Sequence, residues 1–213
     1  MGLYMLSIIY DEISTRLHQI EFKTIWNNFN LYKFAVYNDS ECFFDGRYIS
    51  KTDEFLANTS ILYQGEFIAI WKINEPFESI DFDELTSKIV HEMFHAFQQQ
   101  SHENRYPNEM EALMQYTYDR TNLSIKLQEA QYLNSFFISG NRRSFDDFLK
   151  CRKHRLQTFP YETTYESQVE QIEGTAQYVE LLALEQLNES KGQSAWKRLF
   201  ENTLNPKLTS LSE

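Results

Sequence analysis

The apolar pattern of the chain changes its period near residue 81, and this change limits the folds that the sequence can adopt. Before residue 81, runs of aromatic and β-branched residues at 31–37 and 61–73 are typical of short strands. After it, apolar side chains recur every four residues from Leu85 to Phe97, which is the stripe of an amphipathic helix. Strands first and helices after indicate an α+β fold.

Two turn signals define the expected strands. Asp45-Gly46 stands in the middle of residues 42–49, and Gln64-Gly65 stands inside residues 61–73. Two-residue turns that end in glycine favour hairpins, because the backbone of such a turn needs positive φ angles. We therefore predict a small antiparallel or mixed sheet in the N-terminal half of the chain.

Capping residues mark the boundaries of several helices. Asp81 with Glu84 forms a variant of the capping box at the start of the stripe, and Ser144 with Asp147 opens another helix, which Pro160 closes. The C-terminal half is therefore expected to be mainly helical. The expected helices span residues 10–26, 81–103, 108–137, 144–159 and 165–188.

Charge and cysteine content exclude several classes of protein. The 20 basic and 31 acidic residues give a net charge of -11, which repels nucleic-acid phosphates, so no nucleic-acid partner is expected. No apolar run approaches the roughly 18 residues of a membrane helix, and the N-terminus lacks the pattern of a signal peptide. We expect a cytoplasmic protein without a membrane partner. Cys42 and Cys151 are expected to be buried thiols and not a disulfide.

The sharpest motif is His91-Glu92-Met93-Phe94-His95, in the predicted helix that carries the apolar stripe but with both histidines on another face. Histidines four residues apart project from one face of a helix and can hold one Zn²⁺ at about 2.0–2.1 Å. Glu92 lies about 100° around the same helix, where a carboxylate can act as a general base. A catalytic zinc usually takes three protein ligands, so a third ligand is expected downstream.

Glu173 is the most informative candidate for the third ligand. It lies at the edge of an apolar helical seam, so its carboxylate can point toward the helix on which that seam packs. Gly174 costs about 0.5–1 kcal/mol inside a helix, which we interpret as the requirement of a close approach between two helix backbones. The other candidates are His102, Glu109, Glu111, His154, Glu166 and Glu170.

The two motifs together resemble the glutamate-zincin metallopeptidases, in the branch that includes zinc aminopeptidases. The matching residues are His91-Glu92-x-x-His95 and Glu173-Gly174-x-Ala176-x-Tyr178. The resemblance implies a zincin-like fold, Zn²⁺ held by His91, His95 and Glu173, and hydrolysis of a peptide or protein substrate with Glu92 as the general base. The Gly-x-Met-Glu-Asn motif that binds a substrate amino terminus in aminopeptidases is absent, so that specificity is not implied. Residues 148–155 also resemble uncharacterised bacterial zincin-like proteins.

The chain is expected to form a single domain, because its 213 residues contain no repeat and no Ser-, Gly- or Pro-rich linker. We divide it into a strand-rich segment, two active-site helices and a helical insert. These parts are residues 1–80, residues 81–103 with 165–188, and residues 104–164.

Several supporting roles are open at the level of sequence. Gln177 and Glu170 each lie about one helical turn from Glu173 and could orient a ligand. A phenol or imidazole is expected to stabilise the oxyanion, and the strand at 67–71 could pair with an extended substrate as an edge strand. The oxyanion candidates are Tyr161, Tyr165, Tyr178 and His154.

Two alternatives to an active peptidase remain. The chain could be a catalytically silent zincin-like module that binds a regulatory partner, or a helical protein in which the motif is accidental. We interpret the basic run from Lys150 to Arg155 as a solvated helix face. The alternative is a patch that binds an acidic peptide or the acidic surface of the protein itself.

Overall fold

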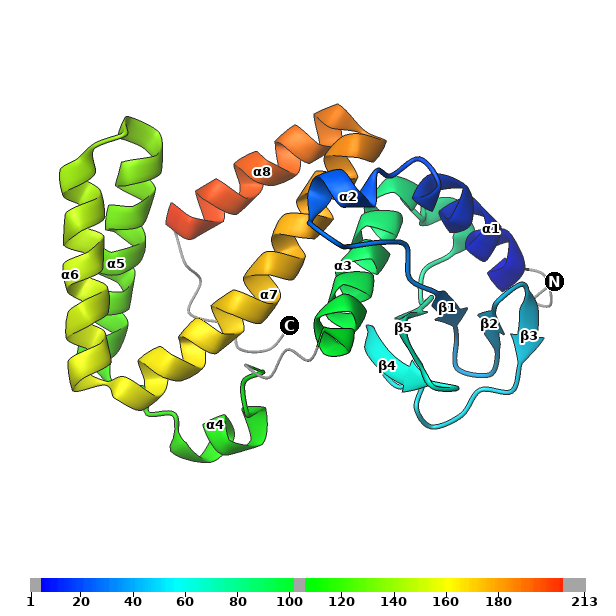
Figure 1. Ribbon diagram of the computed structural model, residues 1–213, viewed down its shortest axis with the longest axis horizontal. Coiled ribbons are helices and arrows are strands. Elements are labelled where there is room, and N and C mark those ends of the chain that lie inside the picture. Colours follow the sequence, from blue (N-terminus) through cyan, green and yellow to red (C-terminus); the bar gives the residue numbers. More distant parts are fainter. Residues whose placement is uncertain (1–4, 102–105, 205–213) are drawn as a thin grey trace. The chain divides into compact units, whose positions relative to one another are not determined.

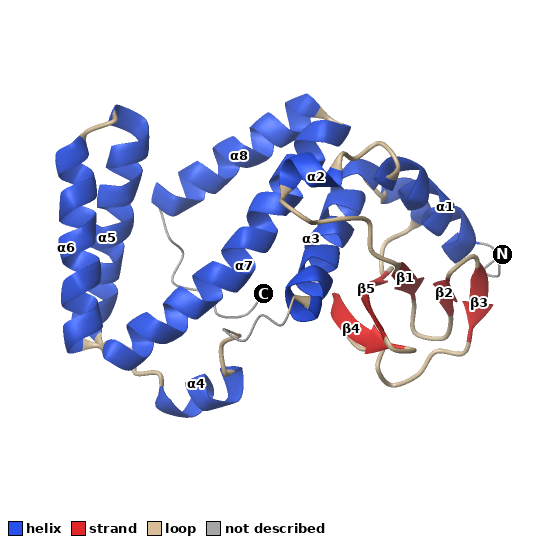
Figure 2. Ribbon diagram, in the orientation of Figure 1, coloured by secondary structure: helices blue, strands red, loops and turns tan. Residues whose placement is uncertain are grey.

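The computed structural model describes residues 5–101 and 106–204 and has the predicted α+β architecture, with a small sheet in the N-terminal half and helices after it (Figures 1 and 2). The described chain forms two compact units. The first contains residues 5–101 and 172–193, and the second contains residues 106–171 and 194–204. The helical insert predicted from residue 104 to 164 therefore corresponds to most of the second unit.

The sheet of the first unit has five strands in the order β3-β2-β1-β5-β4. Strands β1 and β5 run parallel, with Phe34 opposite Ala69, and every other neighbouring pair is antiparallel, so the sheet is mixed. The strands are β1 (Phe34–Tyr37), β2 (Cys42–Phe44), β3 (Arg47–Ile49), β4 (Thr59–Tyr63) and β5 (Glu66–Lys72).

Both predicted hairpin turns are confirmed. Asp45 and Gly46 have φ angles of 51° and 75° and connect β2 to β3. Gln64 and Gly65 have φ angles of 52° and 85° and connect β4 to β5. Positive φ at both central residues matches the right-handed twist of the flanking strands, which explains why these short sequences form tight hairpins.

Strand β5 is an inner strand, so residues 67–71 form an ordinary core strand and do not offer the edge that pairing with a substrate requires. It pairs with β1 on one side and with β4 on the other. The parallel β1–β5 pairing joins strands that are distant in sequence, and local patterns carry no signal for it. Among the described strands, β4 and β3 are the edges.

The predicted helix at residues 10–26 is instead two helices, α1 (Met5–Leu17) and α2 (Phe22–Ile25). Between them the chain turns, which keeps Ile20 and Phe22 buried in the core. The first unit also contains the 3-10 helix η1 (Phe77–Ser79), α3 (Phe82–Gln100), the part of α7 (Pro160–Leu187) from residue 172, and the start of α8 (Glu189–Leu204).

Helix α3 is the central element of the first unit. Asp81 caps its N-terminus, because the Asp81 carboxylate accepts hydrogen bonds from the backbone N–H groups of Asp83 and Glu84 at 3.1 and 3.2 Å. Its apolar stripe is buried. The helix lies against β4 and β5 (Figure 1). The core also includes Ala176 and Val179 of α7, so the sheet and α7 both pack on α3.

The close approach of two helices occurs at Gly192 and not at Gly174, which corrects the prediction. A Cβ atom added to Gly192 would lie 2.5 Å from the Cα atom of Glu185, whereas one added to Gly174 would meet nothing within 4 Å. The backbone of α8 thus passes directly over that of α7 beyond a tight turn. Sequence alone did not distinguish these two helical glycines.

Alanine substitutions at the two glycines should have opposite effects. We expect Gly192→Ala to destabilise the protein by about 1–3 kcal/mol, because backbone atoms cannot move aside cheaply. Gly174→Ala should stabilise it by about 0.5–1 kcal/mol through the higher helix propensity of alanine. Urea unfolding of both variants measures the two effects, and a loss of stability in Gly174→Ala would show that this position is packed after all.

The second unit is helical in its described residues. It contains α4 (Glu109–Gln115), α5 (Arg120–Ser139), α6 (Arg142–Thr158), the first part of α7 and the last part of α8. Helices α5 and α6 lie side by side (Figure 1). The single helix predicted at 108–137 is interrupted between α4 and α5, where Asp119 caps α5. Helix α8 lies beyond the last predicted helix.

The turn between α5 and α6 shifts a predicted helix start. Gly140, with φ 66°, ends α5, and the Asn141 side chain caps α6. Ser144, the predicted cap, is buried and lies 3.1 Å from the hydroxyl of Ser135 instead. Pro160 is the first residue of α7, a position where the missing N–H of proline costs nothing.

The interior of the second unit is polar, which changes the interpretation of the basic run. Arg155 is 0% exposed, and its guanidinium donates hydrogen bonds to Asn122, Glu129 and Glu166 at 2.9, 3.0 and 2.5 Å. Arg152 bonds Glu129 and, at 2.9 Å, Glu170. A solvated face is therefore the wrong description for these two arginines, because they bind acidic side chains of the same unit.

Two further expectations concern cysteines and membranes. Both cysteines are free, Cys42 buried and Cys151 half-buried. None of the helices that the structure describes combines the length and the apolar character needed to cross a membrane.

Candidate metal centre

Three side chains of the first unit converge as predicted. The Nε2 atoms of His91 and His95 are 3.1 Å apart, and the Oε2 atom of Glu173 lies 3.5 Å from the first and 3.4 Å from the second. The histidines come from α3 and Glu173 comes from the part of α7 that packs on α3. These three atoms form a nearly equilateral triangle.

The dimensions of the triangle fit a zinc ion. Ligand atoms placed tetrahedrally at about 2.0–2.1 Å from Zn²⁺ stand about 3.3–3.4 Å from one another. The observed separations of 3.1–3.5 Å match that value without any movement of the backbone. Two imidazoles with one carboxylate also form a donor set that binds zinc in preference to the hard cations Mg²⁺ and Ca²⁺, which favour oxygen ligands alone.

The other ring nitrogens of the histidines have acceptors of their own. His91 Nδ1 lies 3.0 Å from the Glu180 carboxylate, and His95 Nδ1 lies 2.8 Å from the side-chain oxygen of Gln98. Because a carboxylate only accepts, Nδ1 of His91 carries a proton. Metal-binding histidines are oriented in this way, with one nitrogen donating to a fixed acceptor and the other free to bind.

The electrostatics of the site follow from the crowding of these groups. Burial favours the neutral imidazole, but Glu173 and Glu180 outweigh it and raise the pKa of His91 to about 9. In return, the close approach of His91 and His95 holds the pKa of Glu173 far below its usual range. A metal ion bound here therefore displaces a proton from His91, since imidazole must be neutral to bind.

Glu92 is buried beside this group, as its place in the motif predicts. Glu92 is only 9% exposed, and this burial raises the pKa of its carboxyl above the usual value for glutamate. Glu173 and Glu180 also raise the pKa, while His91 and His95 lower it. A carboxylate with a raised pKa close to a metal-binding group is suited to accept and return a proton.

The two residues predicted to orient the histidines do not do so among the described contacts. Gln177 is half-buried and makes no described hydrogen bond to either ring. Glu170 belongs to the second unit, where it binds both terminal nitrogens of the Arg152 guanidinium at 2.9 and 3.2 Å. That pairing ties the Glu170 carboxylate to Arg152, and the described contacts give it no role at the histidines.

The predicted oxyanion candidates are distributed over both units. Tyr161, Tyr165 and His154 belong to the second unit, whereas His91 belongs to the first. Tyr178 belongs to the first unit, but it lies about 140° around α7 from Glu173 and its ring packs against Trp26. None of the four is thus placed at the metal centre by the described contacts.

The structure does not test the remaining ligand candidates. Glu109, Glu111 and Glu166 belong to the second unit, and Glu166 is bound to Arg155. His102 lies outside the described residues. The group of His91, His95 and Glu173 is the one cluster of possible metal ligands within the described chain.

Sequence reasoning missed Glu180 and Gln98. Glu180 follows Glu173 by seven residues, about two helical turns, and therefore lies on the same face of α7. Gln98 follows His95 by three residues on α3. Helical spacing places each residue on the same face as a predicted ligand, but it does not show which polar residue of that face contacts a histidine ring.

Replacing the Glu180 carboxylate, which accepts the hydrogen bond of His91 Nδ1, should weaken metal binding. We expect Glu180→Gln to lower zinc affinity about 10–100-fold, since an amide is a weaker acceptor and can present its N–H₂ to the ring. Competition with a chromogenic chelator measures the dissociation constant. Glu185→Gln, on the same helix and lining a different surface recess, is the matched control. Equal affinities in the two variants would remove Glu180 from the site.

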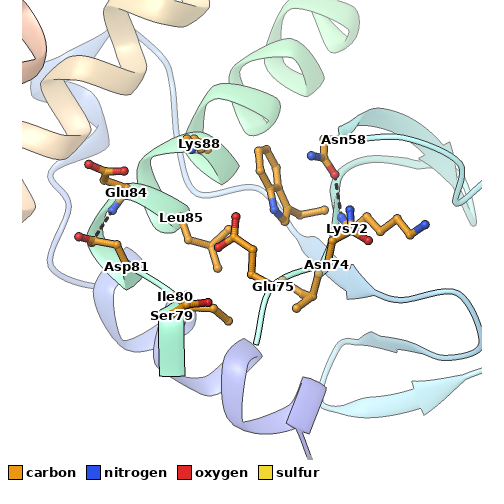
Figure 3. Close-up of a pocket in the computed structure, with 12 residues that line it drawn as sticks. Asn58, Lys72, Asn74, Glu75, Ser79, Ile80, Asp81, Glu84, Leu85 and Lys88 are labelled. Carbon is orange, nitrogen blue, oxygen red and sulfur yellow. Dashed lines mark hydrogen bonds between the residues drawn. The ribbon is translucent and has the colours of Figure 1, made fainter. Parts of the chain in front are cut away.

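A separate recess lies near the start of α3 (Figure 3). It has a volume of about 230 Å³ and is lined by apolar side chains such as Leu85 and by the charged side chains of Lys72, Glu75 and Lys88. Its lining contains none of the metal-centre residues, so the candidate site does not depend on it.

The chain was compared with family models, curated proteins and solved structures. None of these comparisons gives a match.

Proposed function

We propose that the protein is a zinc-dependent hydrolase of peptide bonds. The observation that carries the proposal is the convergence of His91 Nε2, His95 Nε2 and Glu173 Oε2 to within 3.1–3.5 Å of one another. These three residues would hold the ion. Zinc in such a site supplies Lewis acidity, which activates water and polarises a substrate carbonyl.

Glu92 is the residue that moves protons in this proposal. Its buried carboxylate takes a proton from the attacking water and then gives it to the nitrogen of the departing amine. The buried position of Glu92 beside the ligands lets one carboxylate make both transfers. Glu180 and Gln98 keep both imidazoles oriented throughout.

Strand β4 supports an extended peptide as the substrate. It ends the order of the described sheet on one side and lies against α3, which carries the histidines. An extended chain can add to such an edge through main-chain hydrogen bonds, a mode that requires no particular side-chain sequence. This role replaces the one that the sequence suggested for residues 67–71.

Digestion of a peptide library tests the proposal directly. We expect cleavage by the zinc-loaded protein, loss of cleavage after chelation and recovery when zinc is restored. The catalytically silent module predicts bound zinc without any cleavage, and the accidental motif predicts neither. Zinc binding with no hydrolysis across the library would therefore overturn the peptidase and favour the silent module.

A further inference from the structure

Gln98 has a buried amide that makes hydrogen bonds to residues of both α3 and α7, the helices of the candidate metal centre. It is 7% exposed and lies on α3, one turn after His95. Its nitrogen donates to the backbone carbonyl of Ile172 at 3.1 Å and to the hydroxyl of Thr175 at 3.0 Å. Ile172 and Thr175 flank Glu173 in α7, so the amide is bonded to the turn that carries the third ligand.

The orientation of this amide is fixed by its partners. A backbone carbonyl only accepts, so the N–H₂ group must face Ile172, and the side-chain oxygen must then face His95. His95 Nδ1 is therefore the protonated nitrogen, and Nε2 presents its lone pair to the site. The Thr175 hydroxyl can accept from Gln98 because it donates its own hydrogen to Ile172 at 3.2 Å.

We propose that Gln98 is a positioning residue that couples His95 to Glu173, so that the tautomer of one ligand and the place of the other are set together. The proposal rests on the proposed function for the identity of the ion. Through its hydrogen bonds, the Gln98 side chain fixes the position of α7 relative to α3 before a metal binds.

Such a device is useful because Glu173 is otherwise weakly held. Its side chain is 56% exposed, and its described partners are the two histidines themselves. A long exposed carboxylate loses conformational freedom when it binds an ion, and a fixed backbone turn reduces that cost. Gln98 fixes the turn from α3, at the cost of burying one amide whose polar atoms are satisfied.

A double-mutant cycle on zinc affinity tests the coupling. Gln98→Met is similar in shape and removes all three bonds, and we expect it to weaken zinc binding about 10–100-fold. Thr175→Val removes only the hydroxyl and should weaken it about 3–10-fold, the loss typical of one hydrogen bond. Since both changes break the same link, the double variant should bind no worse than Gln98→Met alone. Thr175→Ser keeps the hydroxyl and should bind like the wild type.

The control is Gln100→Met, an exposed glutamine on the same helix, which should leave zinc affinity unchanged. Zinc affinity of Gln98→Met within twofold of the wild type would overturn the proposal. So would additive effects of the two substitutions, or a wild type that binds no zinc. If the wild type binds zinc but cleaves no peptide, the proposed function fails while the coupling by Gln98 is still measured.

Discussion

Glu92→Gln should lower kcat for peptide hydrolysis by about 10²–10⁴-fold while zinc stays bound. Glutamine has nearly the shape of glutamate, so the buried position is filled without a cavity. The amide cannot accept a proton from water near neutral pH, and it cannot return one to the leaving amine. Steady-state rates on a cleaved peptide and elemental analysis of the same sample measure both quantities.

The control for this substitution is Glu78→Gln, which removes an exposed carboxylate of η1 in the same unit. It should retain wild-type rates and zinc content. Full activity in Glu92→Gln would exclude this residue as the general base. Loss of zinc in Glu92→Gln would instead show that the buried carboxylate supports the ligands themselves.

Arg155→Met should destabilise the second unit by about 3–5 kcal/mol, because it removes the buried cation that two buried carboxylates share. Glu129 and Glu166 are 3% and 6% exposed, and both accept hydrogen bonds from the guanidinium. Native-state hydrogen exchange of the α5 and α6 amides measures the change within this unit alone. Lys153→Met, at an exposed position of the same helix, should change stability by less than about 0.5 kcal/mol.

The pH dependence of the same experiment gives a second test. Burial raises the pKa of Glu166, but Lys126, Tyr116 and Arg155 outweigh it and keep that pKa below its usual value. A carboxyl with a lowered folded-state pKa stabilises the fold above its unfolded pKa of about 4.3 and loses this contribution as the pH falls. The difference between the wild type and Arg155→Met should therefore narrow below about pH 4.3. A constant difference would contradict the ion pair.

The parts of the fold that local sequence determines were predicted from it. The period of four from Leu85 to Phe97 predicted α3, and Asp45-Gly46 predicted a hairpin, because helix stripes and turn angles depend on neighbouring residues. The place of Glu173 at the edge of a helical seam predicts a ligand, and the described contacts bring its carboxylate to both histidines.

Features that depend on distant contacts were missed. Glu180 lies 89 residues from His91 in sequence, so no local pattern identifies it as the acceptor on Nδ1. Arg155 stands in a run of basic residues typical of a solvated face, yet it is buried because Glu129 and Glu166 lie opposite it. Gly174 and Gly192 differ in the atoms that pack against them, and helix propensity depends on the residue type alone.

The zinc content of the purified chain tests the central claim most directly. After equilibration with zinc and removal of loosely bound ion, elemental analysis should find one zinc per chain in the wild type. His91→Ala, His95→Ala and Glu173→Ala should each lose the ion, since each removes one of the three converging atoms. A wild type without stoichiometric zinc, or a Glu173→Ala variant that retains it with unchanged affinity, would contradict the proposed metal centre.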